Sequence, residues 1–493
     1  MNKIKNNSEV LDKARKYEND FYNSISAEER PGFHLSAPIG WINDPNGFSR
    51  FNGEYHLFYQ HHPYKTQWGP MHWGHSKSTD FIKWDQLPVA LAPDEFYDKS
   101  GCFSGSAVEF DGKHVLMYTG VLENREEDGS NTVRQTQCIA IGDGINYEKL
   151  ECNPVITSDL LPPGSSLEDF RDPKIWIEDG EFYVVVGSRH EDGSGQILLY
   201  SSKNLKEWEL VTILDKSENK IGKMWECPDF FNIDGHDIIV ISPQEMKAEK
   251  LDFHNGNNTV YIIGKYDKES KTFNRQDYRA IDYGIDFYAP QTFKNEDGRR
   301  IMIAWMQNWE NRIAPQDFKW YGMMTMPREI TVKDGTLIQS PVREIENYYK
   351  NTVEYKNTSI KEEVNLDGIY GRELDMTIEI NDGDYSEFEI KIAKNEQYET
   401  IINYNKKKNI LSFDRSYSGN YGDILHKREM NVKNQGGKIK LRLILDKYSA
   451  EIFVNDGEQV MTNTFYTPLD AKDISFSADG ESIIDIVKHD IIV

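Results

Sequence analysis

The sequence predicts an all-β protein, a five-bladed β-propeller followed by a C-terminal β-sandwich, with a short N-terminal helix. Three observations lead to this class. A hairpin pattern recurs five times, the last third of the chain alternates apolar and polar residues, and the first thirty residues are charged and amphipathic. A chain of 493 residues is too long for one ordinary core. The expected domains are residues 1–31 (helical segment), 32–345 (propeller) and 355–493 (sandwich).

The N-terminal segment predicts an amphipathic helix and lacks the continuous apolar core of a signal peptide. No stretch of the sequence approaches the roughly 20 apolar residues of a membrane span. The four cysteines (Cys102, Cys138, Cys152 and Cys227) form no CxxC pair and are too few to cross-link a chain of this length. Free thiols in a reducing compartment follow, so we expect a cytoplasmic protein.

The repeat lies in the middle of the chain. Five segments each contain a polar or Pro-containing turn, a short apolar run, a Gly-containing turn and a strongly apolar strand. The turn glycines are Gly53, Gly112, Gly180, Gly235 and Gly298. Asn-Gly or Asp-Gly between strand-like runs is a strong hairpin signal, because a tight hairpin needs positive φ. Repetition at about 60 residues predicts radially arranged four-stranded sheets; an array of sandwiches with coincidental spacing is the alternative.

Beyond residue 350 the pattern changes to runs such as ELDMTIEI, SEFEIKIA and KIKLRLIL. Their alternation of apolar and polar residues is typical of antiparallel strands with one solvated face, which predicts the sandwich.

The net charge of −24 repels phosphate backbones and anionic lipids, so nucleic-acid and membrane partners are not expected. A neutral sugar is compatible with it, and the aromatic content of 12% favours sugar stacking.

Three repeats open with a carboxylate close to a proline: Asp44 before Pro45, Asp172 before Pro173, and Glu226 two residues before Pro228. Proline restricts the preceding residue, which holds the side chain in a fixed direction. Because the first strand of each propeller blade lines the axis, we expect the three carboxylates to meet in one funnel. The alternative is that Asp-Pro only begins a turn.

Such a trio suits glycoside hydrolysis, which needs a carboxylic acid for the leaving oxygen and a carboxylate at the anomeric carbon. Like charges raise the pKa of one member, whereas the adjacent Arg171 makes Asp172 the poorer acid candidate. Flat apolar faces for sugar rings are expected from Trp41, Trp68, Trp73, Trp225 and Trp305.

These residues resemble glycoside hydrolase family 32, the group of invertases, sucrose-6-phosphate hydrolases and fructanases. The motifs WINDPNGF, WGPMHWGH, FSGS, FRDP, WECPDFF, DFYAPQTF and IAWMQNW stand in the family's order, and AEIFVNDGEQVMTNTFY resembles its sandwich domain. The resemblance implies retaining hydrolysis of the terminal β-D-fructofuranosidic bond of sucrose or sucrose 6-phosphate, through a covalent fructosyl-aspartate. An exo-acting fructan hydrolase is the alternative within the family.

The resemblance also implies roles for single residues. Asp44 matches the nucleophile, Glu226 the acid/base, and Asp172 the transition-state stabiliser. Residues that match positions around the fructose are Trp41, Asn43, Gln60, Trp68, Phe103, Ser104, Arg171, Tyr288 and Trp305. No cofactor or metal is implied, and a homodimer is a possible assembly.

Two readings from other classes stay open. A metal hydrolase is suggested by His56, His61, His62, His72 and His75, but no HExxH motif accompanies them. A non-catalytic carbohydrate-binding protein would not require both Asp44 and Glu226. Residue Lys65, in the loop HHPYKTQWGP, is a candidate contact for a substrate phosphate.

Overall fold

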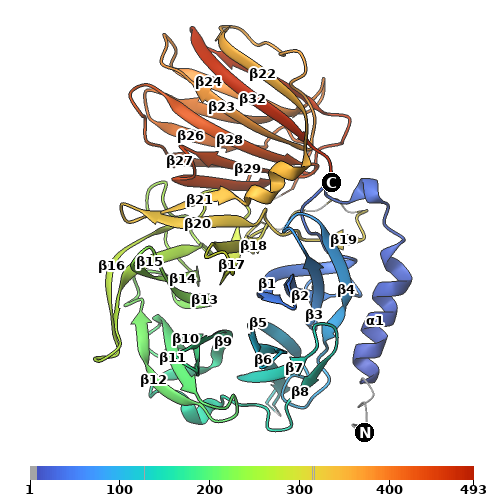
Figure 1. The fold of residues 1–493 in the computed structure, drawn as a ribbon, viewed down its shortest axis with the longest axis vertical. Coiled ribbons are helices and arrows are strands. Elements are labelled where there is room, and N and C mark those ends of the chain that lie inside the picture. The colour runs from blue at the N-terminus through green and yellow to red at the C-terminus, as the bar shows by residue number, and fades with distance from the viewer. Residues whose placement is uncertain (1–7, 127, 312, 314, 316, 423) are drawn as a thin grey trace.

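The computed structural model describes residues 8–493, apart from 127, 312, 314, 316 and 423. Five sheets with four antiparallel strands each stand around a central axis, and a two-sheet sandwich lies above them (Figure 1). The predicted propeller followed by a sandwich is confirmed. In chain order the propeller strands are β1 (Gly40–Phe51), β2 (Glu54–His62), β3 (His72–Ser78), β4 (Trp84–Leu91); β5 (Gly101–Phe110), β6 (Lys113–Arg125), β7 (Asn131–Gly142), β8 (Tyr147–Lys149); β9 (Ser165–Glu178), β10 (Glu181–His190), β11 (Gly195–Ser202), β12 (Glu209–Lys216); β13 (Met224–Ile233), β14 (His236–Gln244), β15 (Val260–Asp267), β16 (Thr272–Ala280); β17 (Tyr288–Lys294), β18 (Arg300–Trp305), β20 (Arg328–Lys333) and β21 (Thr336–Pro341).

The five turn glycines all join the first strand of a sheet to its second. Each has positive φ, between 65° and 87°. In four turns the residue before the glycine also has positive φ: Asn52, Asp111, Asp179 and Asp234. Two consecutive positive φ values define the tight turn whose twist matches a hairpin, which is why Asn-Gly and Asp-Gly recur here.

The ring of sheets is closed by a short strand from a distant part of the chain. Strand β19 (Trp320–Tyr321) pairs in parallel with β1, so that Gly40 lies opposite Trp320. The next residues join the last sheet, where the Met306 amide donates to the Met323 carbonyl at 2.8 Å. The chain between β18 and β20 therefore hydrogen-bonds the fifth sheet to the first.

The sandwich has a six-stranded and a five-stranded antiparallel sheet, with a core of buried Ile, Leu, Phe and Met side chains between them. The first sheet has the order β22 (Tyr349–Ile360), β32 (Ser482–Ile491), β23 (Leu374–Ile380), β28 (Ile439–Asp446), β29 (Ser449–Val454) and β30 (Gln459–Thr464). The second has the order β27 (Lys427–Asn431), β26 (Ile410–Asp414), β25 (Thr400–Asn405), β24 (Glu387–Lys394) and β31 (Asp473–Ala478).

The N-terminal helix α1 (Glu9–Tyr22) lies along the first sheet (Figure 1). Ser8 caps it by accepting a hydrogen bond from the Leu11 amide at 3.1 Å, and Leu11, Ala14 and Glu18 form its buried face. Short 3₁₀ helices follow at Ala27–Glu29, Ser158–Leu160 and Arg343–Tyr348. Within the described residues, no helix has both the length and the apolar character needed to cross a membrane.

A buried ionic network joins the propeller to the sandwich. The His34 ring contacts Asp446 at 2.8 Å and Glu451 at 2.9 Å. Arg328 contacts the other oxygen of Glu451 at 2.6 Å and Asp282 at 3.0 Å. All five side chains are fully buried. Such a network orients the two domains, because separating them would leave uncompensated charges out of water.

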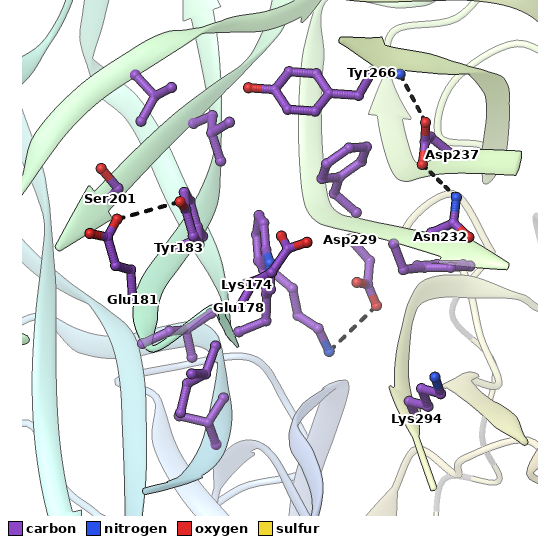
Figure 2. Close-up of a pocket in the computed structure, with 18 of the residues that line it drawn as sticks. Lys174, Glu178, Glu181, Tyr183, Ser201, Asp229, Asn232, Asp237, Tyr266 and Lys294 are labelled. Carbon is purple, nitrogen blue, oxygen red and sulfur yellow. Dashed lines mark hydrogen bonds and ion pairs between the residues drawn. The ribbon is translucent and has the colours of Figure 1, made fainter. Parts of the chain in front are cut away.

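A cavity of about 800 Å³ with aromatic walls lies at one end of the propeller axis (Figure 2). It is the end toward which the inner strands run, so their later residues line it. Lys174 and Asp229 face it and pair at 3.4 Å. Lys174 follows Asp172 by two residues on β9, and Asp229 follows Glu226 by three on β13. The three carboxylates predicted from the sequence therefore belong to the other end of the axis.

We predict that His34→Gln destabilises the fold by about 3 kcal/mol, because it removes the cation between two buried carboxylates. Burial opposes protonation of His34, but hydrogen bonds to Asp446 and Glu451 raise its pKa to about 9. The unfolded value is about 6.5, so the contribution of His34 is complete below pH 6.5 and is lost as the pH rises through 9.

Urea unfolding of the wild type and the variant, at about pH 6 and about pH 9.5, measures this difference. We expect a larger loss of stability at the lower pH. His489→Gln is the matched control, because among the described residues this half-buried histidine hydrogen-bonds Thr352 and stacks on Tyr349, and it forms no ion pair with a carboxylate. An equal loss at both pH values would contradict the assignment of a protonated His34.

Candidate active site

The inner strands of the propeller carry bulges where they face the axis. The register of β13 against β14 and of β17 against β18 slips at one point, and that of β9 against β10 slips at two, the first of them at Asp172. At these points Asp172, Cys227 and Ala289 have positive φ (66°, 47° and 52°), and each precedes a proline. A bulge re-aims side chains that a regular strand would direct to opposite faces.

The bulges refine the expected equivalence of the carboxylates. Asp44, Asp172 and Cys227 occupy the same position, directly before a proline. Glu226 lies one residue earlier, at the position that Arg171 and Tyr288 occupy in their own sheets. Two equivalent positions of the inner strands therefore face the axis, the residue directly before the proline and the residue one earlier. At the first of these positions, the fourth sheet has the thiol of Cys227 in place of an aspartate.

Asp44, Asp172 and Glu226 line one pocket of about 500 Å³. The thiol of Cys227 lies between the two aspartates, 3.6 Å from Oδ2 of Asp44 and 3.6 Å from Oδ2 of Asp172. Ser104 donates to Asp44 at 2.7 Å, and the Cys227 amide donates to Asp172 at 2.9 Å. Segments more than 180 residues apart therefore meet as the repeat predicts.

Glu226 is held from two sides. Nε and Nη2 of Arg171 donate to its Oε1 at 3.0 and 2.9 Å, and the Tyr288 hydroxyl donates to its Oε2 at 2.6 Å. From the sequence we expected the guanidinium of Arg171 to favour the ionised form of the neighbouring Asp172. The charge of Arg171 does favour the ionised form of Asp172, but its hydrogen bonds at this point of the site go to Glu226.

The carboxyl groups cannot all ionise freely. Burial and the charge of Glu226 raise the pKa of Asp44. The same two causes raise the pKa of Asp172 to about 7, although Arg171 works in the opposite direction. Burial and Asp172 raise the pKa of the Cys227 thiol, which therefore stays protonated and can donate to both aspartates. The site as a whole retains a proton near neutral pH.

Most of the predicted sugar-binding residues line the pocket: Asn43, Gln60, Trp68, Phe103, Ser104 and Arg171. Trp41, Tyr288 and Trp305 are buried behind it. Trp41 donates to Asn43 at 2.8 Å and stacks on Tyr321, with ring centroids 4.3 Å apart. Trp305 packs against Trp41 at 6.0 Å.

The expectation that five tryptophans offer faces to sugar holds for Trp68 and is wrong for the other four, since Trp41 and Trp305 are buried as well. Trp73 and Trp225 are fully buried between sheets, where Trp73 donates to the Phe103 carbonyl and Trp225 to the Ile221 carbonyl. Trp68 is 45% exposed and meets Phe103 edge to face at 5.9 Å. Trp68 is thus the tryptophan of the five that presents a free ring to the pocket.

Trp309 also lines the pocket and closes the motif IAWMQNW, but it was not singled out from the sequence. The other lining residues carried no motif that would have identified them: Val121, Glu123, Val133, Gln135, Glu168, Asp169, Gln244 and Asn257. Gln135 illustrates the reason. It lies in the middle of β7 and accepts hydrogen bonds from the Phe170 amide at 3.0 Å and from Arg171 at 3.3 Å. Only the packing of neighbouring sheets reveals that role.

The clustered histidines lie on β2 and β3 of the first sheet, and His61 also pairs with Glu18 of α1 at 3.2 Å. His56 contacts His75 at 2.9 Å, and His61 contacts the Trp41 carbonyl at 2.9 Å. Burial lowers the pKa of His56 to about 4 and that of His72 to about 3. His56 and His72 are therefore neutral packing groups near neutral pH, whereas the expected absence of a metal stays a prediction.

Two family models match the chain and together span most of it. The model "Glycosyl hydrolases family 32 N-terminal domain" matches residues 34–341, and the model "Glycosyl hydrolases family 32 C terminal" matches residues 344–491. The raffinose invertase of Escherichia coli is 36% identical over 457 residues, covering 92% of this chain and 93% of the relative. A sucrose-6-phosphate hydrolase of Zymomonas mobilis is 36% identical over 491 residues, covering 94% and 92%.

Among solved structures, a GH32 β-fructofuranosidase of Bombyx mori superposes with a TM-score of 0.86 at 31% identity, covering 99% of both chains. A variant of the same silkworm enzyme in complex with sucrose gives a TM-score of 0.85.

We predict that Asp172→Asn stabilises the folded protein at about pH 8 by about 3 kcal/mol. The raised pKa of Asp172 means that its ionised form is disfavoured in the fold. This penalty is complete above pH 7 and vanishes below about pH 4, where the carboxyl group is protonated in both states. Thermal unfolding at about pH 8 and about pH 5 measures the gain, which should be larger at the higher pH.

Asp446→Asn is the matched control of opposite sign. Burial opposes ionisation of Asp446, but His34 and the amides of residues 32 and 33 lower its pKa. Its substitution should therefore destabilise the protein at about pH 8. A loss of stability for both variants at that pH would contradict the repulsion among the carboxylates.

Proposed function

The chain belongs to glycosyl hydrolases family 32, and from this premise we propose that Asp44, Glu226 and Asp172 carry out retaining hydrolysis of a β-fructofuranosidic bond. The protein is a glycoside hydrolase that releases fructose from sucrose or sucrose 6-phosphate. One observation carries the assignment of the residues: the carboxyl groups of three separate sheets line a single pocket.

In the first step Oδ of Asp44 attacks C2 of the fructosyl unit while the bond from C2 to the glycosidic oxygen breaks. Glu226 transfers its proton to that oxygen, so that the leaving glucose departs neutral. Ser104 and Asn43 hold the attacking carboxylate at 2.7 and 3.0 Å. The product of this step is a covalent fructosyl ester of Asp44.

In the second step Glu226, now a carboxylate, takes a proton from water as the water oxygen attacks C2 and releases Asp44. Positive charge develops at C2 in both steps. Asp172 stabilises this charge and can accept hydrogen bonds from the fructose hydroxyls. Burial keeps water from screening these interactions, which strengthens them.

The proton for the first step is supplied by the coupled carboxyl groups. In the free site Arg171 and Tyr288 both donate hydrogen bonds to Glu226. The pKa of the nearby Asp172 is raised, so that carboxyl group holds a proton near neutral pH. We assign that proton to Glu226 in the complex with substrate, where the glycosidic oxygen becomes its acceptor. On this assignment, activity depends on whether the coupled carboxyl groups together hold one proton, and not on the pKa of any one of them alone.

The other expectations stay predictions: a cytoplasmic location, a homodimer, and the absence of nucleic-acid and membrane partners. The four cysteines are free thiols in the structure, which supports a reducing compartment.

Substitution of the two reacting carboxylates should stop catalysis. We expect Asp44→Asn and Glu226→Gln each to lower kcat for sucrose by roughly 10³-fold or more, because the first removes the nucleophile and the second the proton donor. Asp172→Asn should lower kcat more than it changes KM. Asp277→Asn, a half-buried carboxylate paired with Arg279, is the control.

Near-normal turnover by either of the first two variants would refute the roles given to Asp44 and Glu226. The covalent route is tested on the wild type with methanol as a competing acceptor. Two successive inversions must give the β-methyl fructofuranoside, so formation of the α product would refute the fructosyl ester.

The pH profile provides an independent check. Because a proton with a pKa of about 7 must be present, kcat/KM for sucrose should fall as the pH rises above about 7. Arg171→Gln removes the cation that lowers the pKa of Asp172. The alkaline limb of the surviving activity should therefore move to higher pH, and a shift to lower pH would contradict the electrostatic role of Arg171.

A further inference from the structure

A line of alternating charges runs from the active site to the surface. Each member is linked to the next by an ion pair, and the members are, in order, Glu226, Arg171, Asp169, Arg189, Glu245 and Lys223. The inner contacts are short: Arg171 lies 2.9 Å from both Glu226 and Asp169. The line ends on two cations, Arg189 and Lys223, joined through one carboxylate.

These outer cations do not line the pocket themselves, but each lies next to a residue that does, Arg189 beside Asp169 and Lys223 beside Gln244. Arg189 belongs to β10, which pairs with the strand that carries Arg171 and Asp172. Lys223 directly precedes β13, and its amide donates to the Gln244 carbonyl at 2.9 Å. Both Asp169 and Gln244 line the pocket. Because Glu226 protonates the glycosidic oxygen, this side of the pocket receives the leaving glucose.

Arg189 is held far more loosely than Arg171. Its Nη1 lies 3.9 Å from Asp169 and 3.7 Å from Glu245, both longer than a hydrogen bond. Within the described residues, its guanidinium donates no hydrogen bond. The side chain is 34% exposed. A guanidinium presents paired N–H donors that match the oxygens of a phosphate, so Arg189 retains its binding capacity.

Glu245 is the group that an incoming anion would replace. Its side chain is half exposed and contacts Lys223 at 2.7 Å. Exposed ion pairs of this kind contribute only about 0–1 kcal/mol, so exchanging the carboxylate for another anion costs little. A phosphate dianion carries more charge and more acceptor oxygens than Glu245, which favours the exchange.

We propose that Arg189 and Lys223 form a subsite for a phosphate group on the leaving glucose, and that this phosphate displaces the carboxylate of Glu245. The proposal rests on the proposed function, since it places the glucose beside Glu226. Sucrose 6-phosphate carries its phosphate on the primary hydroxyl of that glucose. Lys65, the candidate from the sequence, is exposed, and among the described residues no ion pair connects it to the line of charges that reaches Glu226.

The test compares kcat/KM for sucrose 6-phosphate with kcat/KM for sucrose. Arg189→Gln and Lys223→Gln should each lower the ratio of the two by about tenfold, and the double variant by more, because each removes one cation from the phosphate. Glu245→Gln should raise the ratio, because the competing carboxylate is gone. Lys65→Gln is the matched control and should leave the ratio unchanged.

Product inhibition adds a readout that does not require turnover of the phosphorylated substrate. Glucose 6-phosphate should inhibit the hydrolysis of sucrose by the wild type more strongly than glucose does, and Arg189→Gln should remove the difference. Inorganic phosphate is tested in parallel. If inorganic phosphate inhibits as well as glucose 6-phosphate, the cations bind free anions rather than a sugar phosphate, and the proposal is overturned.

The proposal fails if the double variant keeps the wild-type ratio of the two kcat/KM values. An equal fall of kcat/KM for both substrates is one such result, and it would mean that Arg189 only supports Asp169. A change in the ratio for Lys65→Gln alone would place the phosphate at the other side of the pocket. The proposed function is judged separately, by whether the wild type releases fructose from sucrose at all.

Discussion

The contact between Arg171 and Glu226 makes the arrangement of the active site possible. Three carboxyl groups lie in a pocket that burial makes poor in water, where Glu226 raises the cost of ionising both aspartates and Asp44 adds to that of Asp172. One buried guanidinium offsets part of this repulsion. Burial lowers the pKa of Arg171, but the charges of Glu226 and Asp172 raise it by more, so the guanidinium stays protonated. The reactive groups can therefore stay close together without all being neutralised.

The same cation connects the chemistry to the outer part of the pocket. Through Asp169, Arg171 is linked to Arg189 and the charges beyond it. A network of this kind keeps the net charge near the reacting groups small while the protein as a whole carries −24. The overall charge thus describes solubility and long-range repulsion, whereas the substrate meets a local arrangement of opposite charges.

The geometry of the site depends on backbone that regular strands would not adopt. Positive φ at Asp172 and Cys227 costs about 1 kcal/mol or more at each residue. The paired strands on either side, the ring closed by β19, and the ionic network around His34 hold this conformation in place. Strain of this kind is found where the direction of a side chain matters more than local stability.

The amino-acid sequence by itself determined the repeat, the hairpin turns at Gly53 and its four counterparts, and the convergence of Asp44, Asp172 and Glu226. These follow from local rules, since positive φ, proline and alternating polarity act over a few residues. Only the tertiary structure decided that Arg171 hydrogen-bonds Glu226, that Trp225 is buried while Trp68 is exposed, that Gln135 lines the pocket, and that Arg189 lies beside the lining residue Asp169. The physical reason is that a bulge and the packing of neighbouring sheets set the direction of each side chain, and both depend on residues far away in the chain.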